Sequence, residues 1–130
     1  MKKILIAISM LIFSILLVET YSCAQTKPDP ENLLRHIVII TFKPGTAADS
    51  IGVLDNVYKN LSKSAFAKDF EMGVNISTRD TSETKHVYVT TFASKEDMKS
   101  YKKIPEYASL FKISLRIAED VSVVDYWAEK

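Results

Sequence analysis

The strongest constraint in this sequence is a short stretch, residues 36–43 (His-Ile-Val-Ile-Ile-Thr-Phe-Lys), followed directly by Pro44 and Gly45. It is β-branched and aromatic and too short for a stable helix, so it predicts a β-strand. Alternate side chains of a strand point to opposite faces, and here both faces are mostly apolar. A strand with one face in water alternates apolar and polar residues instead. Each face must therefore be covered, and we expect helices over one face and a second copy of the chain over the other.

The N-terminal residues predict an export signal. Two lysines precede a 15-residue run, 4–18, that is apolar except for two serines, and small residues follow it. A membrane-spanning helix needs ~20 residues, so an uncleaved anchor is the less favoured alternative. We expect residues 1–24 to be a signal peptide, residues 25–33 a tether and residues 34–128 a single domain.

Two modes of cleavage fit the end of this signal. Ser22 and Ala24 suit a site with small residues, which would release a soluble protein beginning at Gln25. Alternatively Cys23, the only cysteine of the chain, is the lipidated first residue of a bacterial lipoprotein, and we favour this alternative slightly. Either route exports the protein to the cell envelope or periplasm. A lipid at Cys23 is the only contact with a membrane that we expect.

Composition argues against several classes of partner. After the signal the chain has no cysteine, hence no disulfide, and its basic and acidic residues are equal in number. No basic stripe is present, which argues against binding to nucleic acid or to anionic lipid by charge. A metal site needs three or four ligands, and only dispersed carboxylates such as Glu106 could join the two histidines. We therefore expect no metal and no cofactor.

Strands and helices alternate in the rest of the pattern. Period-two alternation or β-branched runs predict strands at residues 34–43, 67–77, 85–92 and 121–127. Capping-box patterns open two helical segments, Thr46 to about 61 and Ser94 to about 118, and Ile104-Pro105 divides the second. The order β-α-β-β-α(α)-β predicts an α+β fold with a ferredoxin-like subunit. Its four-stranded antiparallel sheet carries helices on one face.

The opposite face of this sheet would be bare. It would carry an apolar set that monomers rarely expose: Ile37, Ile39, Thr41, Val87 and Val89. Packing this face against the same face of a second copy is the simplest way to cover it, which predicts a homodimer. The alternative is that the C-terminal tail covers the face or that it stays exposed.

Five segments resemble the stress-responsive dimeric α/β-barrel (Dabb) family: Leu34–Thr46, Gly73–Ser77, His86–Ser94, Tyr101–Tyr107 and Val121–Tyr126. Together they span nearly all of the chain after the signal. The resemblance implies a ferredoxin-like subunit whose sheets pair into a dimeric α/β barrel.

One plant member of the family is a cyclase that folds a polyketide in a pocket between sheet and helices. The resemblance implies that His36, His86 and Tyr101 line such a pocket here. The family's His-Pro-x-His pattern is Ile104-Pro105-Glu106-Tyr107 in this chain, so a tyrosine stands where that cyclase has its catalytic histidine. A tyrosine with an ordinary pKa near ~10 is a poor base at neutral pH, which argues against that reaction.

The candidate catalytic residues are His36, His86 and Tyr101. We expect the two histidines at equivalent ends of their strands on the helix-facing side, where they could polarise or deprotonate a ligand beside a tyrosine. The alternative, which we favour, is that both are half-buried and bonded to backbone carbonyls. Candidate ligand-binding residues on the same side of the sheet or on the helices are Val38, Ile40, Tyr58, Tyr88 and Tyr107.

Three functions remain open. The first is an exported homodimer that binds a small apolar molecule between sheet and helices. The second is a cofactor-independent enzyme, similar to a polyketide cyclase or a monooxygenase, with a His/Tyr acid–base pair. The third is a purely structural dimer with a filled interior. A cavity of ~300 Å³ or more would favour the first two.

Overall fold

The computed structural model describes residues 32–77 and 83–129. The expected signal peptide, Cys23 and most of the expected tether lie outside the described residues. Within those two ranges, no helix is long and apolar enough to cross a membrane.

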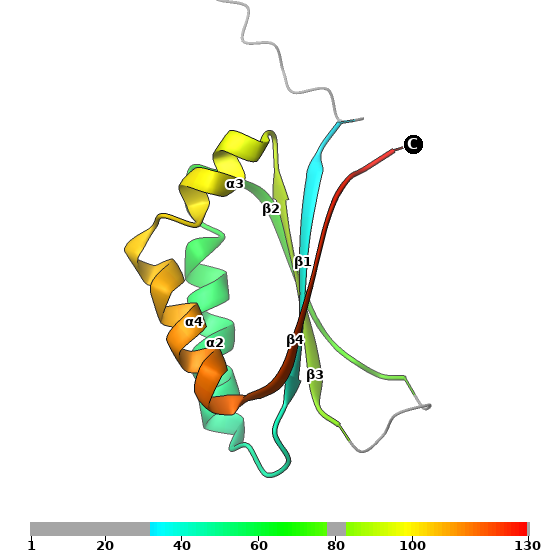
Figure 1. Cartoon of the computed structure of the whole chain (residues 1–130), viewed down its shortest axis with the longest axis vertical. Helices are drawn as coiled ribbons and strands as arrows, with labels where there is room; N and C mark the ends of the chain where they lie inside the picture. The colour runs from blue at the N-terminus through cyan, green and yellow to red at the C-terminus, as the bar shows by residue number, and fades with distance from the viewer. Residues whose placement is uncertain (1–31, 78–82, 130) are drawn as a thin grey trace, which may run out of the picture.

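The described chain folds into one sheet with helices on one side (Figure 1). The elements, in order, are β1 (Leu34–Phe42), α2 (Ala48–Leu61), β2 (Ala67–Val74), β3 (Lys85–Phe92), α3 (Lys95–Tyr101), α4 (Pro105–Ile117) and β4 (Ala118–Trp127). The strand order is β2-β3-β1-β4 and all neighbours are antiparallel. The predicted ferredoxin-like order is confirmed.

Several predicted element ends were wrong. β2 stops at Val74, three residues before the predicted end, and Ile76 beyond it is 92% exposed. β4 begins at Ala118, directly after α4 and three residues before the predicted start of this strand at Val121. Residue 47 is the N-cap of α2 and makes no side-chain bond, whereas the Thr46 hydroxyl donates to the Lys43 carbonyl instead of capping the helix.

The other predicted cap is present. The Ser94 hydroxyl accepts a hydrogen bond from the Asp97 amide at 3.0 Å, which satisfies one of the free N–H groups at the start of α3. Pro105 occupies the first turn of α4, where its missing N–H costs nothing. Gly45 adopts a positive φ of 78° in the turn after β1, a conformation that other residues rarely adopt.

The hydrophobic core lies between the sheet and α2. One side of β1 and β3 meets α2. Ile40 of β1, Tyr88 and Phe92 of β3 and Leu54 of α2 are fully buried there. Tyr58 of α2 stacks on Tyr88 of β3 with ring centroids 3.8 Å apart, which fixes the helix over the middle of the sheet. The helix-facing side of β1 is therefore covered by its own chain, as the sequence predicts.

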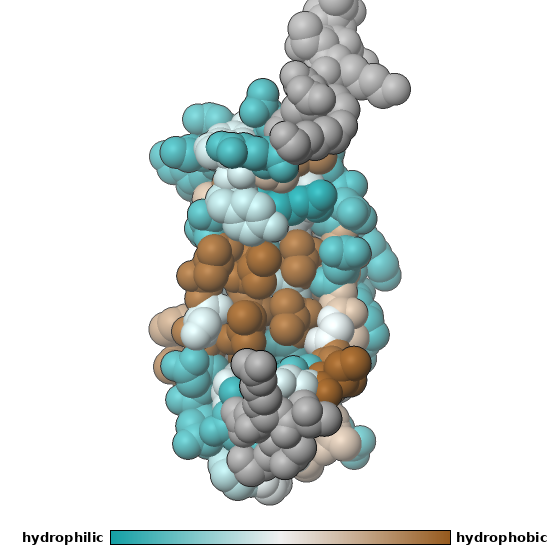
Figure 2. Space-filling view, turned by 90° about the vertical axis from the view of Figure 1, so that its right-hand side faces the viewer, coloured by the Kyte–Doolittle hydropathy of each residue, from teal (hydrophilic) through white to brown (hydrophobic). Residues whose placement is uncertain are grey.

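No strand or helix of the described residues covers the other face of the sheet (Figure 2). An apolar patch fills its centre, and its members share one side of β1, β3 and β4: Ile37, Ile39, Val87, Val89 and Val124. The first four are only half-buried in the monomer and Val124 is 51% exposed. We call this set the bare-face patch.

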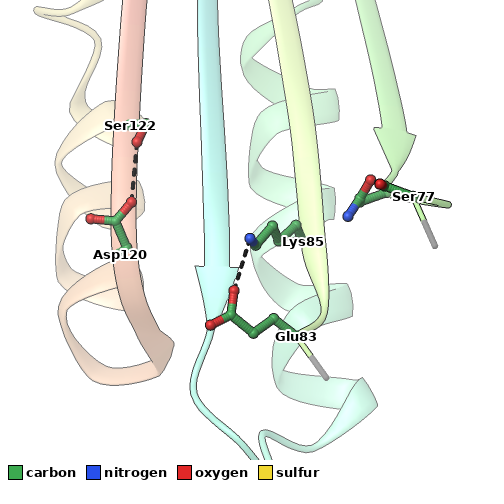
Figure 3. A network of polar contacts seen from close by, with 6 residues as sticks. Ser77, Glu83, Lys85, Asp120 and Ser122 are labelled. Carbon is green, nitrogen blue, oxygen red and sulfur yellow. Dashed lines mark hydrogen bonds and ion pairs between the residues drawn. The ribbon is translucent and has the colours of Figure 1, made fainter. Parts of the chain in front are cut away.

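Polar side chains border the bare-face patch at one end (Figure 3). Lys85 forms a 2.8 Å ion pair with Glu83, and Ser122 donates a 3.1 Å hydrogen bond to Asp120. An apolar centre with a polar border is the composition of a protein–protein interface.

The helices do not cover the sheet completely. The apolar side chains of Phe111 and Leu115 on α4 are 66% and 65% exposed. Val121 and Val123 of β4 point to the helix side of the sheet yet are also about half exposed. β4 is an edge strand, and a gap remains between it and α4.

Candidate functional site

The gap between α4 and β4 opens into a cavity of about 500 Å³. Its walls come from β1, α2, α4 and β4, and its buried lining residues are His36, Val38, Tyr58 and Leu110. Tyr107 of α4 and the half-exposed Val123 of β4 also line it. The volume lies in the range of small-molecule sites, and the walls are mostly apolar with a few polar groups, as such sites are.

His36 is the buried polar group of this cavity. It is 4% exposed, and its Nδ1 lies 2.5 Å from Oδ1 of Asp125. The two residues are direct cross-strand partners on β1 and β4, so their side chains leave the same face of the sheet side by side. The carboxylate fixes the orientation of the imidazole, which is the arrangement found in many sites for acid–base chemistry.

Two tyrosines of the cavity wall remain protonated. Burial raises the pKa of Tyr58, and the neighbouring tyrosines add to the shift. Burial also raises the pKa of Tyr107, with the negative charge of Asp125 as a second cause. At neutral pH both side chains are therefore neutral phenols that can donate a hydrogen bond, and neither serves as a base.

A second group of polar residues lies away from the cavity. Asp55 of α2 accepts hydrogen bonds from His86 Nδ1 at 3.0 Å and from the Tyr88 hydroxyl at 2.7 Å. Burial, followed by the bond to Asp55, raises the pKa of Tyr88, so its hydroxyl stays a donor. Phe42 packs edge-on against the His86 ring at 5.1 Å. This group joins α2 to β3, and none of its members lines the cavity.

The structure separates the two histidines. His36 pairs with Thr90, whereas His86 pairs with Ile40, so they lie four residues apart along β1. This corresponds to about 13 Å at ~3.3 Å per residue. The expectation of equivalent ends was wrong, because β1 and β3 are antiparallel and their first residues lie at opposite ends of the sheet. The expected bonds to backbone carbonyls were also wrong, since each histidine has its own carboxylate.

The third candidate catalytic residue, Tyr101, is 1% exposed and does not line the cavity. Its ring packs edge-on against Tyr107 and Phe92. Burial raises its pKa to about 12. Its hydroxyl lies beside Thr90 but makes no hydrogen bond of normal geometry within the described part of the chain. Tyr101 thus supports Tyr107 from behind.

The candidate ligand-binding residues also divide into residues that line the cavity and residues that do not. Val38, Tyr58 and Tyr107 line the cavity, whereas Ile40 and Tyr88 are completely buried in the core. A role for any of them in binding stays a prediction.

Sequence reasoning missed both carboxylates. Asp125 lies on the same side of β4 as Val121 and Val123. A carboxylate that alternates with two valines in this way indicates a polar group on an otherwise apolar side of the strand. Asp55 lies one turn after Ile51 on the inward stripe of α2, where a charged residue also needs a partner. Among residues 32–77 and 83–129, no group of three or more histidine, cysteine, aspartate or glutamate side chains is placed to hold a metal.

The Asp55 group should stabilise the fold. Asp55→Ala removes the acceptor of two buried donors, so we expect the free energy of unfolding to fall by about 1–3 kcal/mol in urea denaturation. Asn56→Ala is the matched control, because Asn56 is its exposed neighbour on the same helix. Equal effects of the two substitutions would contradict a structural role for Asp55.

Three solved structures illustrate what the chain resembles. A hydroxynitrile lyase from Passiflora edulis is 24% identical with a TM-score of 0.68, and the match covers 78% of this chain and 97% of that one. An Arabidopsis thaliana protein is 29% identical with a TM-score of 0.61, covering 72% and 92%. A dimeric ferredoxin-like protein of unknown function from Thermobifida fusca is 13% identical with a TM-score of 0.64, covering 75% and 92%.

None of the curated proteins compared with the chain matches it. The family model that describes the stress-responsive A/B barrel domain (Dabb) matches residues 34–128. That range includes every strand and helix described above. The chain therefore belongs to the Dabb family.

Proposed function

We propose that this Dabb protein is an exported homodimer that binds one small, mostly apolar molecule per subunit between its sheet and its helices. The observation that carries the proposal is the cavity of about 500 Å³ between α4 and β4. A core that served only to stabilise the fold would be filled by side chains to crystal-like density. Here Phe111 and Leu115 remain exposed beside a space that they could have filled.

Occupancy of the cavity is tested with a blocking variant. Ser114 lines the cavity from α4, so Ser114→Trp places a bulky ring in it. We expect small molecules that co-purify with the wild-type protein, detected by mass spectrometry after denaturation, to be lost from this variant. Ser109→Trp is the control, because Ser109 is exposed on the same helix and does not line the cavity. The same molecules at equal amounts in all three proteins would contradict the proposal.

The bare-face patch supports the dimer. It is an apolar surface at the centre of a sheet face, with a polar border, and the Thermobifida fusca relative is described as dimeric. Two-fold pairing of identical patches would cover both at once. A sheet closed by two such subunits is also the arrangement after which the family is named.

A charge within the patch should separate the subunits. We expect Ile37→Glu to convert a dimer into a monomer in sedimentation velocity, because two buried and unpaired carboxylates would face each other across the two-fold axis. Val53→Glu is the control, since Val53 is 51% exposed on α2, away from this face. A wild-type protein that sediments as a monomer, or an Ile37→Glu protein that stays dimeric, would refute this arrangement.

Export is proposed from the sequence of residues 1–24. The mass of the N-terminal peptide of the native protein distinguishes the lipoprotein from the soluble form. A chain that begins at Cys23 with acyl chains is heavier than its sequence, whereas an unmodified start at Gln25 excludes lipidation.

A second candidate function is acid–base catalysis, and the His36–Asp125 pair favours it. A buried imidazole held by a carboxylate at a cavity can accept a proton from a bound substrate. If a substrate screen finds turnover, we expect His36→Ala to abolish it. His86→Ala should leave it largely intact, because His86 lies outside the cavity. Turnover that survives His36→Ala would exclude this mechanism.

A further inference from the structure

The two nitrogens of His36 lie in different surroundings. Nδ1 faces Oδ1 of Asp125 at 2.5 Å, and the ring is buried. A carboxylate has no proton to donate, so in a neutral imidazole the shared proton must belong to Nδ1. The other nitrogen, Nε2, then carries a lone pair and acts only as an acceptor.

Nε2 is the nitrogen left for a ligand. His36 lines the cavity, and no hydrogen bond reaches Nε2 from any residue within the two described ranges. Within the described residues, the fully buried side-chain atoms without a hydrogen-bond partner are Ser64 Oγ and Tyr101 Oη. Nε2 has no partner either, so it must be accessible from open space.

Glu119, an exposed acidic residue of the lining, lies at the opposite end of β4 from Asp125, the partner of His36. Asp120 also contributes to the lining, but its carboxylate bonds to Ser122 on the other face of the sheet. The hydroxyls of Tyr58 and Tyr107 on the same wall can donate as well as accept, whereas Nε2 of a neutral His36 can only accept.

We propose that Asp125 holds His36 in the Nδ1–H form, so that the cavity selects apolar molecules carrying a hydroxyl group, such as phenols, over the corresponding ethers. Asp125 acts as a positioning residue, and His36 makes the contact. The inference rests on the proposed binding function and adds the chemical class of the ligand to it. A hydroxyl that donates to Nε2 gains a hydrogen bond, whereas an ether oxygen would face a lone pair that stays unsatisfied.

His86 provides an internal comparison. Its Nδ1 faces Asp55, so it should take the same tautomer, but its ring lies away from the cavity. The chain contains only these two histidines, which makes their nitrogen signals easy to assign. His86→Gln identifies the signals of His36 by elimination.

The tautomer is measured first, without any ligand. Protein produced from the full sequence with ¹⁵N-labelled histidine is examined by two-bond ¹H–¹⁵N correlation, at a pH where the spectrum shows that the imidazoles are neutral. We expect a protonated Nδ1 and an unprotonated Nε2 for His36. In Asp125→Asn the amide can donate to Nδ1, so the population with Nε2–H should rise, as replacement of the triad aspartate by asparagine does in serine proteases. A protonated Nε2 in the wild-type protein would overturn the inference.

Selectivity is measured with a matched pair of probes, 4-butylphenol and its methyl ether 4-butylanisole, by titration calorimetry. The ether is the more apolar, so apolar contacts alone would favour it. We expect the phenol to bind about tenfold more tightly to the wild-type protein, the size of one buried hydrogen bond. The preference for the phenol over the ether should shrink or reverse in Asp125→Asn and return in Asp125→Glu. Neither probe should bind to Ser114→Trp.

The outcomes separate the two proposals. Equal binding of both probes to the wild-type protein, or an unchanged preference in Asp125→Asn, would overturn the role of Asp125 and leave the binding function standing. Binding of neither probe to a protein that shows the expected tautomer would refute both the selectivity and the proposed binding of small apolar molecules of this class.

Discussion

The structure depends on the burial of one central strand. β1 bonds to β3 along one edge and to β4 along the other, and its helix-facing side packs into the core. Only its remaining side is left half-buried within a single subunit. A strand that is apolar on both sides can be stable in water only when both sides are covered. The bare-face patch follows directly from this requirement, and so does the proposed dimer.

The cavity follows from how the helices are distributed over four strands. α2 lies over β1 and β3 and holds its place through the Tyr58–Tyr88 stack and the Asp55 group. α4 packs beside α2 and leaves the helix side of the edge strand β4 uncovered. The uncovered strip lies next to His36, the residue of β1 that faces Asp125 across the ladder. The same packing that fixes the core therefore leaves a buried histidine, held by a partly exposed carboxylate, in the wall of a mostly apolar space.

Most of the fold could be predicted from the sequence, because hydrophobic periodicity marks the strands and helices and their order permits few topologies. The alternation of side chains along β1 and β3 also correctly predicted which residues face the helices and which lie on the opposite side of the sheet. The exposure of Phe111 and Leu115 could not be predicted, because periodicity shows that a helix has an apolar face but not how far it shifts across a sheet.

The candidate site was predicted less well. His36 was identified, but it was paired with His86 instead of Asp125, since strand direction was not applied to the positions of the two residues. Once the antiparallel pairing of β1 and β4 is known, the register alone places Asp125 opposite His36. Tyr101 and Tyr88 were chosen for their chemistry, and only tertiary packing shows that both lie behind the cavity wall.

The position of β1 at the start of the domain also has a mechanical consequence. The segment that precedes the fold enters through Leu33, whose carbonyl oxygen bonds to the amide of Ala128 beside the end of β4. A pull on that segment acts along the central strand, which is bonded on both edges over its whole length. The ladders to β3 and to β4 both hold the strand on which such a pull acts. An attachment at this end would thus transmit force to the strand that has hydrogen-bonded neighbours on both edges.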